Sequence, residues 1–217
     1  MKKIITAALA LCCVALFWSI IAFATNNEDM SDHFFRFGQI EREYLDFRGV
    51  SLLRNDDVFI ESAHFVIYES EITLITERHR LGGADDGRER AIRSLLRREV
   101  LYHEALSRGF YTSDTEIRDM IDLNIEATRS SDNFESDVMA FLDALGMTNE
   151  EYWETQADIF RKELTILKFM EAELESIAIS SRLADQEAIE DSLQNYLQSL
   201  IDNYVVSNSL EWALTER

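Results

Sequence analysis

Residues 89–109 combine an apolar stripe with an arginine-rich surface and end in a glycine. The apolar side chains recur at the spacing of one helical face, at Ile92, Leu95, Leu96, Val100, Leu101, Ala105 and Leu106. Gly109 is a favourable end for this helix, because a residue without Cβ enters the left-handed conformation at little cost. The Ser113–Glu116 segment has the pattern of a capping box, in which a hydroxyl and a carboxylate satisfy unpaired backbone N–H groups. The chain is therefore predicted to turn from one helix directly into a second near Gly109.

The absence of proline favours a fold built from long helices. None of the 217 residues is proline, although average usage predicts about ten in this length. Proline breaks helix interiors, so its absence permits uninterrupted helices without requiring them. Only seven residues are glycine, which points the same way. We expect a mainly α protein with at most a short strand or hairpin near residues 50–60.

Apolar periodicity and cap signals place the other predicted helices. A helix is favoured at Asp32–Gly49, although the aromatic content there also suits a strand. Ser62 is predicted to cap a helix that runs to about Arg80, and residues 81–87 form the clearest loop. The remaining predicted helices span 88–108, 114–129, 133–145, a long segment from a capping box at Thr148 through Leu174, and a last segment through Ile189–Tyr204.

The N-terminal segment predicts export or membrane anchoring. Two lysines precede an uncharged apolar stretch from Ile4 to Ala24, which is long enough to span a bilayer as a helix. The stretch ends in Ala22-Phe23-Ala24, a pattern typical of signal-peptide cleavage. Cleavage and retention as an anchor stay open, and either places the rest of the chain on the far side of a membrane. Both cysteines, Cys12 and Cys13, lie in this stretch, so no disulfide is predicted in the exported part.

Four regions are expected along the chain. They are a signal peptide or transmembrane anchor at 1–24, an N-terminal extension at 25–54, a helical domain at 55–205 and a C-terminal tail at 206–217. Removing residues 1–24 removes two lysines and no acid, which brings the net charge from −20 to −22. Nucleic acid and anionic membrane surfaces are therefore unsuitable partners, because binding to a polyanion needs a cationic surface. An uncleaved segment at 4–24 would still contact a membrane through its apolar side chains.

No residue pattern in the chain predicts catalysis, a metal or a cofactor. The histidines fall in separate segments without the spacing of metal ligands, at His33, His64, His79 and His103. Gly82-Gly83 and Gly87 are not followed by the lysine that a phosphate-binding loop requires. Asp85-Asp86-Gly87 lacks the later glutamate of a calcium loop. We expect a protein that is not an enzyme.

Two sets of side chains are candidates for ligand binding. The arginine run from Arg88 to Arg98 is either a receptor for a carboxylate ligand or paired with neighbouring acids, since Glu89–Arg93 and Glu104–Arg108 have the favourable i, i+4 order. The aromatic candidates for a peptide-binding groove are Tyr68, Tyr102, Phe110, Tyr111, Phe141, Tyr152 and Trp153. For most of these, helical spacing also fits an ordinary hydrophobic core.

The order of these features resembles the N-terminal chaperone domain of SurA/PrsA-type extracytoplasmic foldases. The segment VLYHEALSRGFYTSDTEI, from Val100 to Ile117, is similar to the family's leucine-rich helix, glycine step and capped helix. Phe141–Tyr152 resembles the family's next turn, and Ile159–Met170 resembles the long helix that follows. Val58–Phe65 is similar to the opening strand and first helix of that domain. Tyr196–Val205 resembles the helix that returns after the isomerase domain.

The resemblance covers about residues 55–205 and implies an ATP-independent, chaperone-like protein. Family members commonly carry a parvulin prolyl-isomerase domain between the long helix and the returning one, whereas here only the short segment Glu175–Asp185 separates them. We therefore expect no isomerase activity. The implied function is binding of unfolded or extended polypeptide in an apolar groove outside the cytoplasm. Two alternatives stay open, namely an adaptor that docks one folded partner at the membrane and a residual prolyl isomerase.

Overall fold

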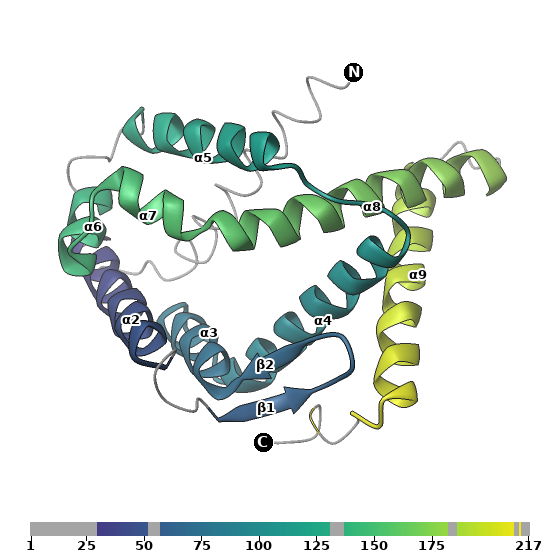
Figure 1. The fold of residues 1–217 in the computed structure, drawn as a ribbon, viewed down its shortest axis with the longest axis horizontal. Helices are drawn as coiled ribbons and strands as arrows, with labels where there is room; N and C mark the ends of the chain where they lie inside the picture. Colours follow the sequence, from purple (N-terminus) through teal and green to yellow (C-terminus); the bar gives the residue numbers. More distant parts are fainter. Residues whose placement is uncertain (1–29, 52–56, 131–136, 182–185, 211–212, 214–217) are drawn as a thin grey trace.

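The computed structural model describes residues 30–51, 57–130, 137–181, 186–210 and 213, and over these ranges the protein is mainly helical (Figure 1). The described helices are α2 (Met30–Ser51), α3 (Glu69–Leu81), α4 (Gly87–Ser107), α5 (Asp114–Arg129), α6 (Met139–Leu145), α7 (Asn149–Thr155), α8 (Ala157–Ser181) and α9 (Gln186–Ser207). The described strands are β1 (Val58–Glu61) and β2 (Val66–Tyr68). The predicted mainly α fold class is confirmed.

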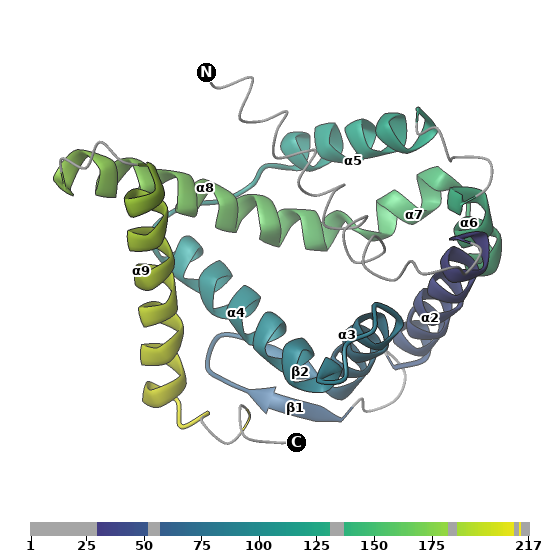
Figure 2. The ribbon, with the colours of Figure 1, turned by 180° about the vertical axis from the view of Figure 1, so that it is seen from behind.

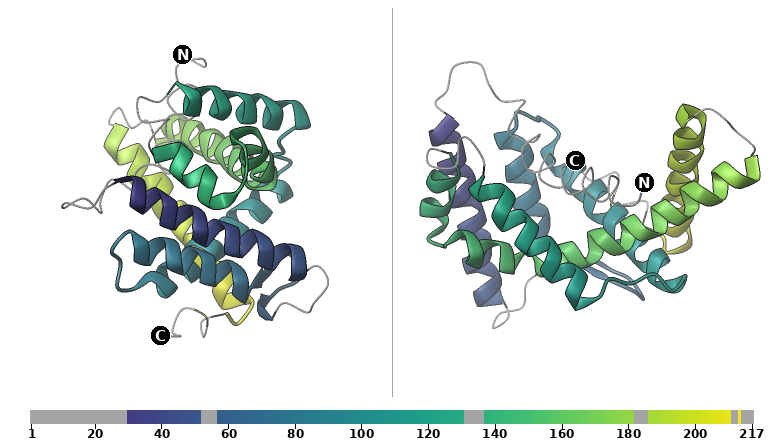
Figure 3. Two further views of the ribbon diagram at one scale, coloured as in Figure 1. Left: turned by 90° about the vertical axis from the view of Figure 1, so that its left-hand side faces the viewer. Right: turned by 90° about the horizontal axis from the view of Figure 1, so that it is seen from above.

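The N-terminal anchor or signal peptide predicted at 1–24 lies outside the described residues. Within the part of the chain that the structure does describe, no helix is both long enough and apolar enough to cross a membrane. The helix predicted at Asp32–Gly49 is confirmed as α2, so the alternative of a strand there is wrong. α2 packs against α6 and α3 (Figure 3) and places Phe34 and Phe37 in a hydrophobic cluster.

An antiparallel hairpin occupies the place where a helix was predicted to begin. β1 pairs with β2 so that Glu61 faces Val66, and Ser62 sits in the connecting turn. The hydroxyl oxygen of Ser62 accepts hydrogen bonds from the N–H groups of Phe65 at 3.1 Å and His64 at 3.3 Å. The predicted helix cap at Ser62 is therefore wrong, because its oxygen closes a turn, and α3 begins only after the second strand. The hairpin lies at 58–68, later than the expected 50–60.

The corner between α4 and α5 forms as the sequence predicts. Gly109 has a φ of 83°, and the N–H of Phe110 donates to the carbonyl of Ala105 at 3.0 Å. The Ser113 hydroxyl accepts from the N–H of Glu116 at 3.3 Å, while the N–H of Ser113 donates to the Glu116 carboxylate at 2.9 Å. These reciprocal bonds are the predicted capping box, and they fix the direction in which α5 leaves the corner.

The long helix predicted from Thr148 is interrupted. The capping box at Thr148 is present, but α7 ends at Thr155 and α8 begins at Ala157. The hydroxyl of Thr155 donates to the carbonyl of Tyr152 at 2.7 Å and also accepts from the side chain of Gln156 at 2.9 Å. These two bonds lie at the junction of α7 and α8. The prediction of one continuous helix is wrong at this point.

Two hydrophobic clusters form the interior, and α8 contributes to both. The first cluster joins the hairpin to α3, α4, α8 and α9, with Ile72, Leu95, Leu96 and Phe169 among its fully buried side chains. The second joins α2, α5, α6 and α7 to the start of α8, with Phe34, Phe141 and Trp153 buried. α9 crosses the far end of α8, and α6 and α7 lie beyond its other end (Figures 1 and 2). α8 therefore contributes side chains to the hydrophobic interior of both halves of the molecule.

Candidate functional site

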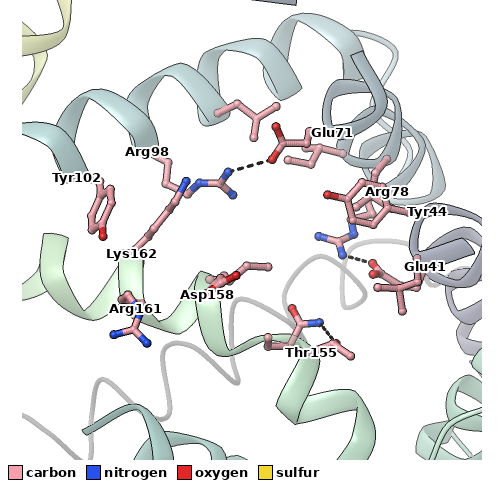
Figure 4. A pocket seen from close by; sticks show the side chains of 16 residues that line it. Glu41, Tyr44, Glu71, Arg78, Arg98, Tyr102, Thr155, Asp158, Arg161 and Lys162 are labelled. Atoms are coloured by element: carbon pink, nitrogen blue, oxygen red, sulfur yellow. Dashed lines mark hydrogen bonds and ion pairs between the residues drawn. The ribbon is translucent and has the colours of Figure 1, made fainter. Parts of the chain in front are cut away.

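A cavity of about 270 Å³ lies between α2, α3 and α4 on one side and the α7–α8 junction on the other (Figure 4). Its apolar lining consists of Leu45, Leu74, Ile75, Leu95 and Ile159. Its polar lining consists of Glu41, Tyr44, Glu71, Arg78, Arg98, Tyr102, Thr155, Gln156, Asp158, Arg161 and Lys162. The walls therefore mix aliphatic side chains with groups of both charges.

A buried ion pair between α2 and α3 forms one end of the cavity. A guanidinium nitrogen of Arg78 contacts the carboxylate of Glu41, whose side chain is only 3% exposed. The guanidinium also lies over the ring of Phe37, 5.6 Å from its centroid. Burial alone would lower the pKa of Arg78, but the Glu41 carboxylate more than offsets this effect and the pKa is raised. The Arg78 guanidinium therefore stays charged, and its contact with the Glu41 carboxylate holds α2 on α3.

The buried hydroxyl of Tyr152 lies near this pair and stays protonated. Burial raises the pKa of Tyr152, and the negative charge of Glu41 raises it further, while Arg78 acts in the opposite direction. The pKa is raised far above its ordinary value, so this phenol cannot act as a base near neutral pH.

A second charged cluster ties α4 to α8 near the other end of the cavity. The ammonium of Lys162 lies 2.7 Å from both carboxylate oxygens of Glu99, and Arg98 donates to the same carboxylate at 2.9 and 3.0 Å. Arg98 also lies 3.6 Å from Glu71. The Lys162 ammonium lies 5.7 Å from the centroid of the Tyr102 ring. These contacts compensate the cations that line the cavity, so its charge is balanced within the protein.

The seven predicted aromatic residues do not converge on one groove. Tyr102 lines the cavity. Phe141, Tyr152 and Trp153 are buried in the second cluster, where the rings of Tyr152 and Trp153 meet edge to face at 5.0 Å. Their burial fits the alternative of an ordinary core.

The other three predicted aromatics lie away from the cavity. Phe110 packs on Phe169 at 5.9 Å at the edge of the first cluster. Tyr68 is 38% exposed at the end of β2, and Tyr111 is 70% exposed at the α4–α5 corner. Of the seven, Tyr102 is thus the one placed to meet a ligand in this cavity.

Several residues of the cavity could not be predicted from local sequence patterns. Glu41 and Tyr44 belong to α2 and Arg78 belongs to α3, so no pattern within one helix brings them together. Ile159 is 37% exposed beside the helix break at Gln156, and that break was not predicted. These positions become neighbours only through the packing of α2 and α8 around α3 and α4.

The arginine run pairs with protein groups. Arg93 binds Glu89 at 2.9 Å and Arg108 binds Glu104 at 2.7 Å, as the i, i+4 order predicts. Arg88 pairs with Glu69, Arg90 pairs with Asp86, and Arg97 contacts Gln194. Arg98 contacts both Glu71 and Glu99. Arg88, Arg90, Arg93 and Arg98 therefore pair with acids, as one of the two interpretations predicts, whereas Arg97 contacts an amide.

A second cavity and a surface groove complete the description of the surface. A cavity of about 220 Å³ beside the hairpin shares Tyr102 and Lys162 with the main cavity. A mostly apolar groove of about 280 Å³ runs between α5 and α8 and includes Leu123. Among the described residues, no group of three or more histidine, cysteine or acidic side chains is arranged to hold a metal ion.

Comparison of the chain with protein-family models, with curated proteins and with solved structures finds no match.

Proposed function

We propose that this protein is an extracytoplasmic, ATP-independent, chaperone-like protein that binds unfolded or extended polypeptide in the cavity among α2, α3, α4 and α8. The observation that carries the proposal is the mixed lining of this cavity. Aliphatic groups such as Leu45 and Ile159 stand beside charged groups that already have partners. Small binding sites commonly pair an apolar lining with a few polar groups.

The dimensions of the cavity favour a short part of an extended chain. A space of about 270 Å³ accepts one or two side chains, whereas a folded partner would need a broad contact surface. The compensated charges offer hydrogen-bonding groups to a peptide backbone without demanding a ligand of one sign. Such a site would bind many sequences weakly and reversibly.

The resemblance of residues 55–205 to SurA/PrsA-type foldases supports the same proposal. Only residues 182–185 lie between α8 and α9, which leaves no room there for the isomerase domain that family members commonly carry. Export follows from the apolar segment at Ile4–Ala24. A net charge of −20 would keep the protein soluble while it holds clients.

The test is aggregation of a chemically unfolded client, followed by light scattering with the purified protein and no nucleotide. The proposal predicts suppression near equimolar ratio. Ile159→Asp places a charge at the mouth of the cavity and should raise the amount of protein needed for half suppression about tenfold, which corresponds to about 1.4 kcal/mol.

Ile179→Asp is the matched control, because Ile179 is also an exposed isoleucine of α8, at 72% exposure, and does not line the described cavities. It should leave suppression unchanged. Equal loss in both variants would mean that the cavity is not the binding site. No suppression by the unmodified protein, together with one complex of fixed stoichiometry in a pull-down, would favour the adaptor instead.

A further inference from the structure

Two histidines from different elements stack on one another at the junction of the hairpin, α4 and α9. The rings of His64 and His103 lie 3.7 Å apart between centroids, with an angle of 15° between their planes. His64 belongs to the hairpin turn and His103 to α4. The ring of Tyr204 from α9 lies 6.4 Å from His103, edge to face, and the Tyr204 hydroxyl donates to the Ser62 hydroxyl in the same turn at 3.0 Å.

We infer that the His64–His103 stack is a proton-sensitive latch that holds the hairpin turn on α4 at neutral pH and releases it on acidification. Two neutral imidazoles, or one neutral and one charged, can stack at this separation. Two imidazolium rings would place two positive charges about as close as an ion pair, with the wrong sign.

The carboxylates near the stack are paired with other cations and are not free to compensate a second positive charge on the histidines. From α4, Glu99 is held by Lys162 of α8 and by Arg98, and Glu104 is held by Arg108. Tyr102 of α4 and Tyr204 of α9 are the other titratable groups at the junction. The carboxylates of Glu99 and Glu104 therefore already have cationic partners.

The pKa of His103 follows this arrangement. Burial lowers it first and the charge of His64 lowers it next, while Glu104 acts in the opposite direction. A lowered folded-state pKa means that the neutral ring is favoured in the folded protein. The latch is therefore intact above the ordinary histidine pKa of about 6.5 and is lost as pH falls through the lower folded value.

A cavity next to the stack provides space into which the hairpin turn can move. His64, Phe65 and Val66 line one wall of the cavity of about 220 Å³ beside α4, and His103 and Leu106 line the other. Separation of the two rings would admit water to this space, and His64 is exposed enough to become hydrated without unfolding the hairpin.

The experiment is amide hydrogen exchange of the full-length protein at pH 7.5 and pH 5.0, corrected for the intrinsic pH dependence of exchange. The N–H of Phe65, which donates to Ser62, reports on the turn. Its protection should fall about fivefold at pH 5.0, the factor expected for two unit charges at this separation in a water-like dielectric. The imidazole proton resonances of His103 should titrate below pH 6.5, as its lowered pKa requires.

His64→Asn and His64→Phe remove the second charge and should keep the turn protected at pH 5.0, with His103 titrating in one step. His79→Asn is the control, because His79 lies on α3 and outside the stack. It should leave the response of the turn intact. The inference is overturned by unchanged turn protection in the unmodified protein, or by an equal loss in His64→Asn.

Discussion

The Glu41–Arg78 pair shows how a single buried residue determines the packing of a helix in this protein. Glu41 is almost completely buried, and Arg78 reaches it from α3 while covering the ring of Phe37. Breaking a buried ion pair leaves one charge without a partner, which costs about 3–5 kcal/mol. Glu41→Leu should therefore lower the free energy of unfolding by about 3 kcal/mol, the lower end of this range, because Arg78 keeps some contact with water. Urea denaturation measures the change.

The double variant Glu41→Leu/Arg78→Met separates charge from shape. Apolar replacements of similar volume at both positions remove the uncompensated charge, so most of the lost stability should return. Stability no higher in the double variant than in Glu41→Leu would show that side-chain packing, and not charge, made Glu41 essential.

Pairs within one helix could be predicted from the sequence, and pairs between helices could not. Glu89–Arg93 and Glu104–Arg108 follow from i, i+4 spacing and are present. Arg108 also binds Glu173 and the Tyr196 hydroxyl, which no local pattern indicates. The main cavity is lined by pairs of the second kind, so the candidates named from the sequence include only Tyr102 and Arg98 among its lining residues.

The start of α5 is an element with a pH-dependent cap. Hydrogen bonding to Lys168 of α8, and then to the backbone of Ser113, lowers the pKa of Glu116 to about 2. The unfolded chain takes up this proton near pH 4.5, so the stabilisation is complete above 4.5 and is lost as pH falls towards 2. Glu116→Gln should therefore lose less stability between pH 6 and pH 3 than the unmodified protein does. Thermal unfolding at the two pH values measures the difference.

Ser113→Ala tests the other half of the same capping box. Removal of a serine N-cap costs about 1 kcal/mol, and this loss should be slightly smaller at pH 3 than at pH 6, because the hydroxyl also donates to the Glu116 carboxylate at 2.8 Å and helps to lower its pKa. A strongly pH-dependent loss in Ser113→Ala would mean that Lys168 does not hold Glu116 independently of the cap.

Gly109 allows a positive φ at the α4–α5 corner, and Gly38 allows a close approach of α2 to α6. Alanine substitution distinguishes these two roles. A Cβ at Gly109 would meet no atom within 4 Å, so Gly109→Ala should cost about 1–2 kcal/mol, from the positive φ alone. A Cβ at Gly38 would collide with the carbonyl oxygen of Phe141 and lie 2.8 Å from the Cβ of Ala144. Gly38→Ala should therefore separate α2 from α6 and cost about 3 kcal/mol, the upper range for overpacking. Chemical denaturation of both variants tests this order.

Helix ends were predictable where the signal was local. Gly109, Ser113 and Thr148 each carry their cap within a few residues, and all three form as predicted. Ser62 has the same residue type, but its hydroxyl serves a hairpin turn whose strands must pair before the turn exists. The break at Gln156 involves no proline or glycine, so no local residue pattern marks it. Tertiary packing determines where such helices begin and end, and single-sequence propensities carry no information about tertiary packing.

At the scale of the whole molecule, α8 joins two clusters into one cooperative unit. Its first turns place Phe160 and Leu164 in the second cluster, and the following turns place Ile166 and Phe169 in the first. Thr165 lies between them, fully buried and hydrogen-bonded to Thr112 at the α4–α5 corner. The sequence predicted α8 as a helix but not its double role, because both faces of the helix carry apolar residues.

Phe169→Ala tests this coupling. Truncation of a buried phenylalanine costs about 3–5 kcal/mol, and the site of the change lies in the first cluster, whereas Trp153 reports on the second. In a variant that keeps Trp153 as its only tryptophan, the urea midpoint seen by fluorescence should fall as far as the midpoint seen by circular dichroism, because α8 transmits the loss. A fluorescence midpoint that does not change would show that the two clusters unfold separately.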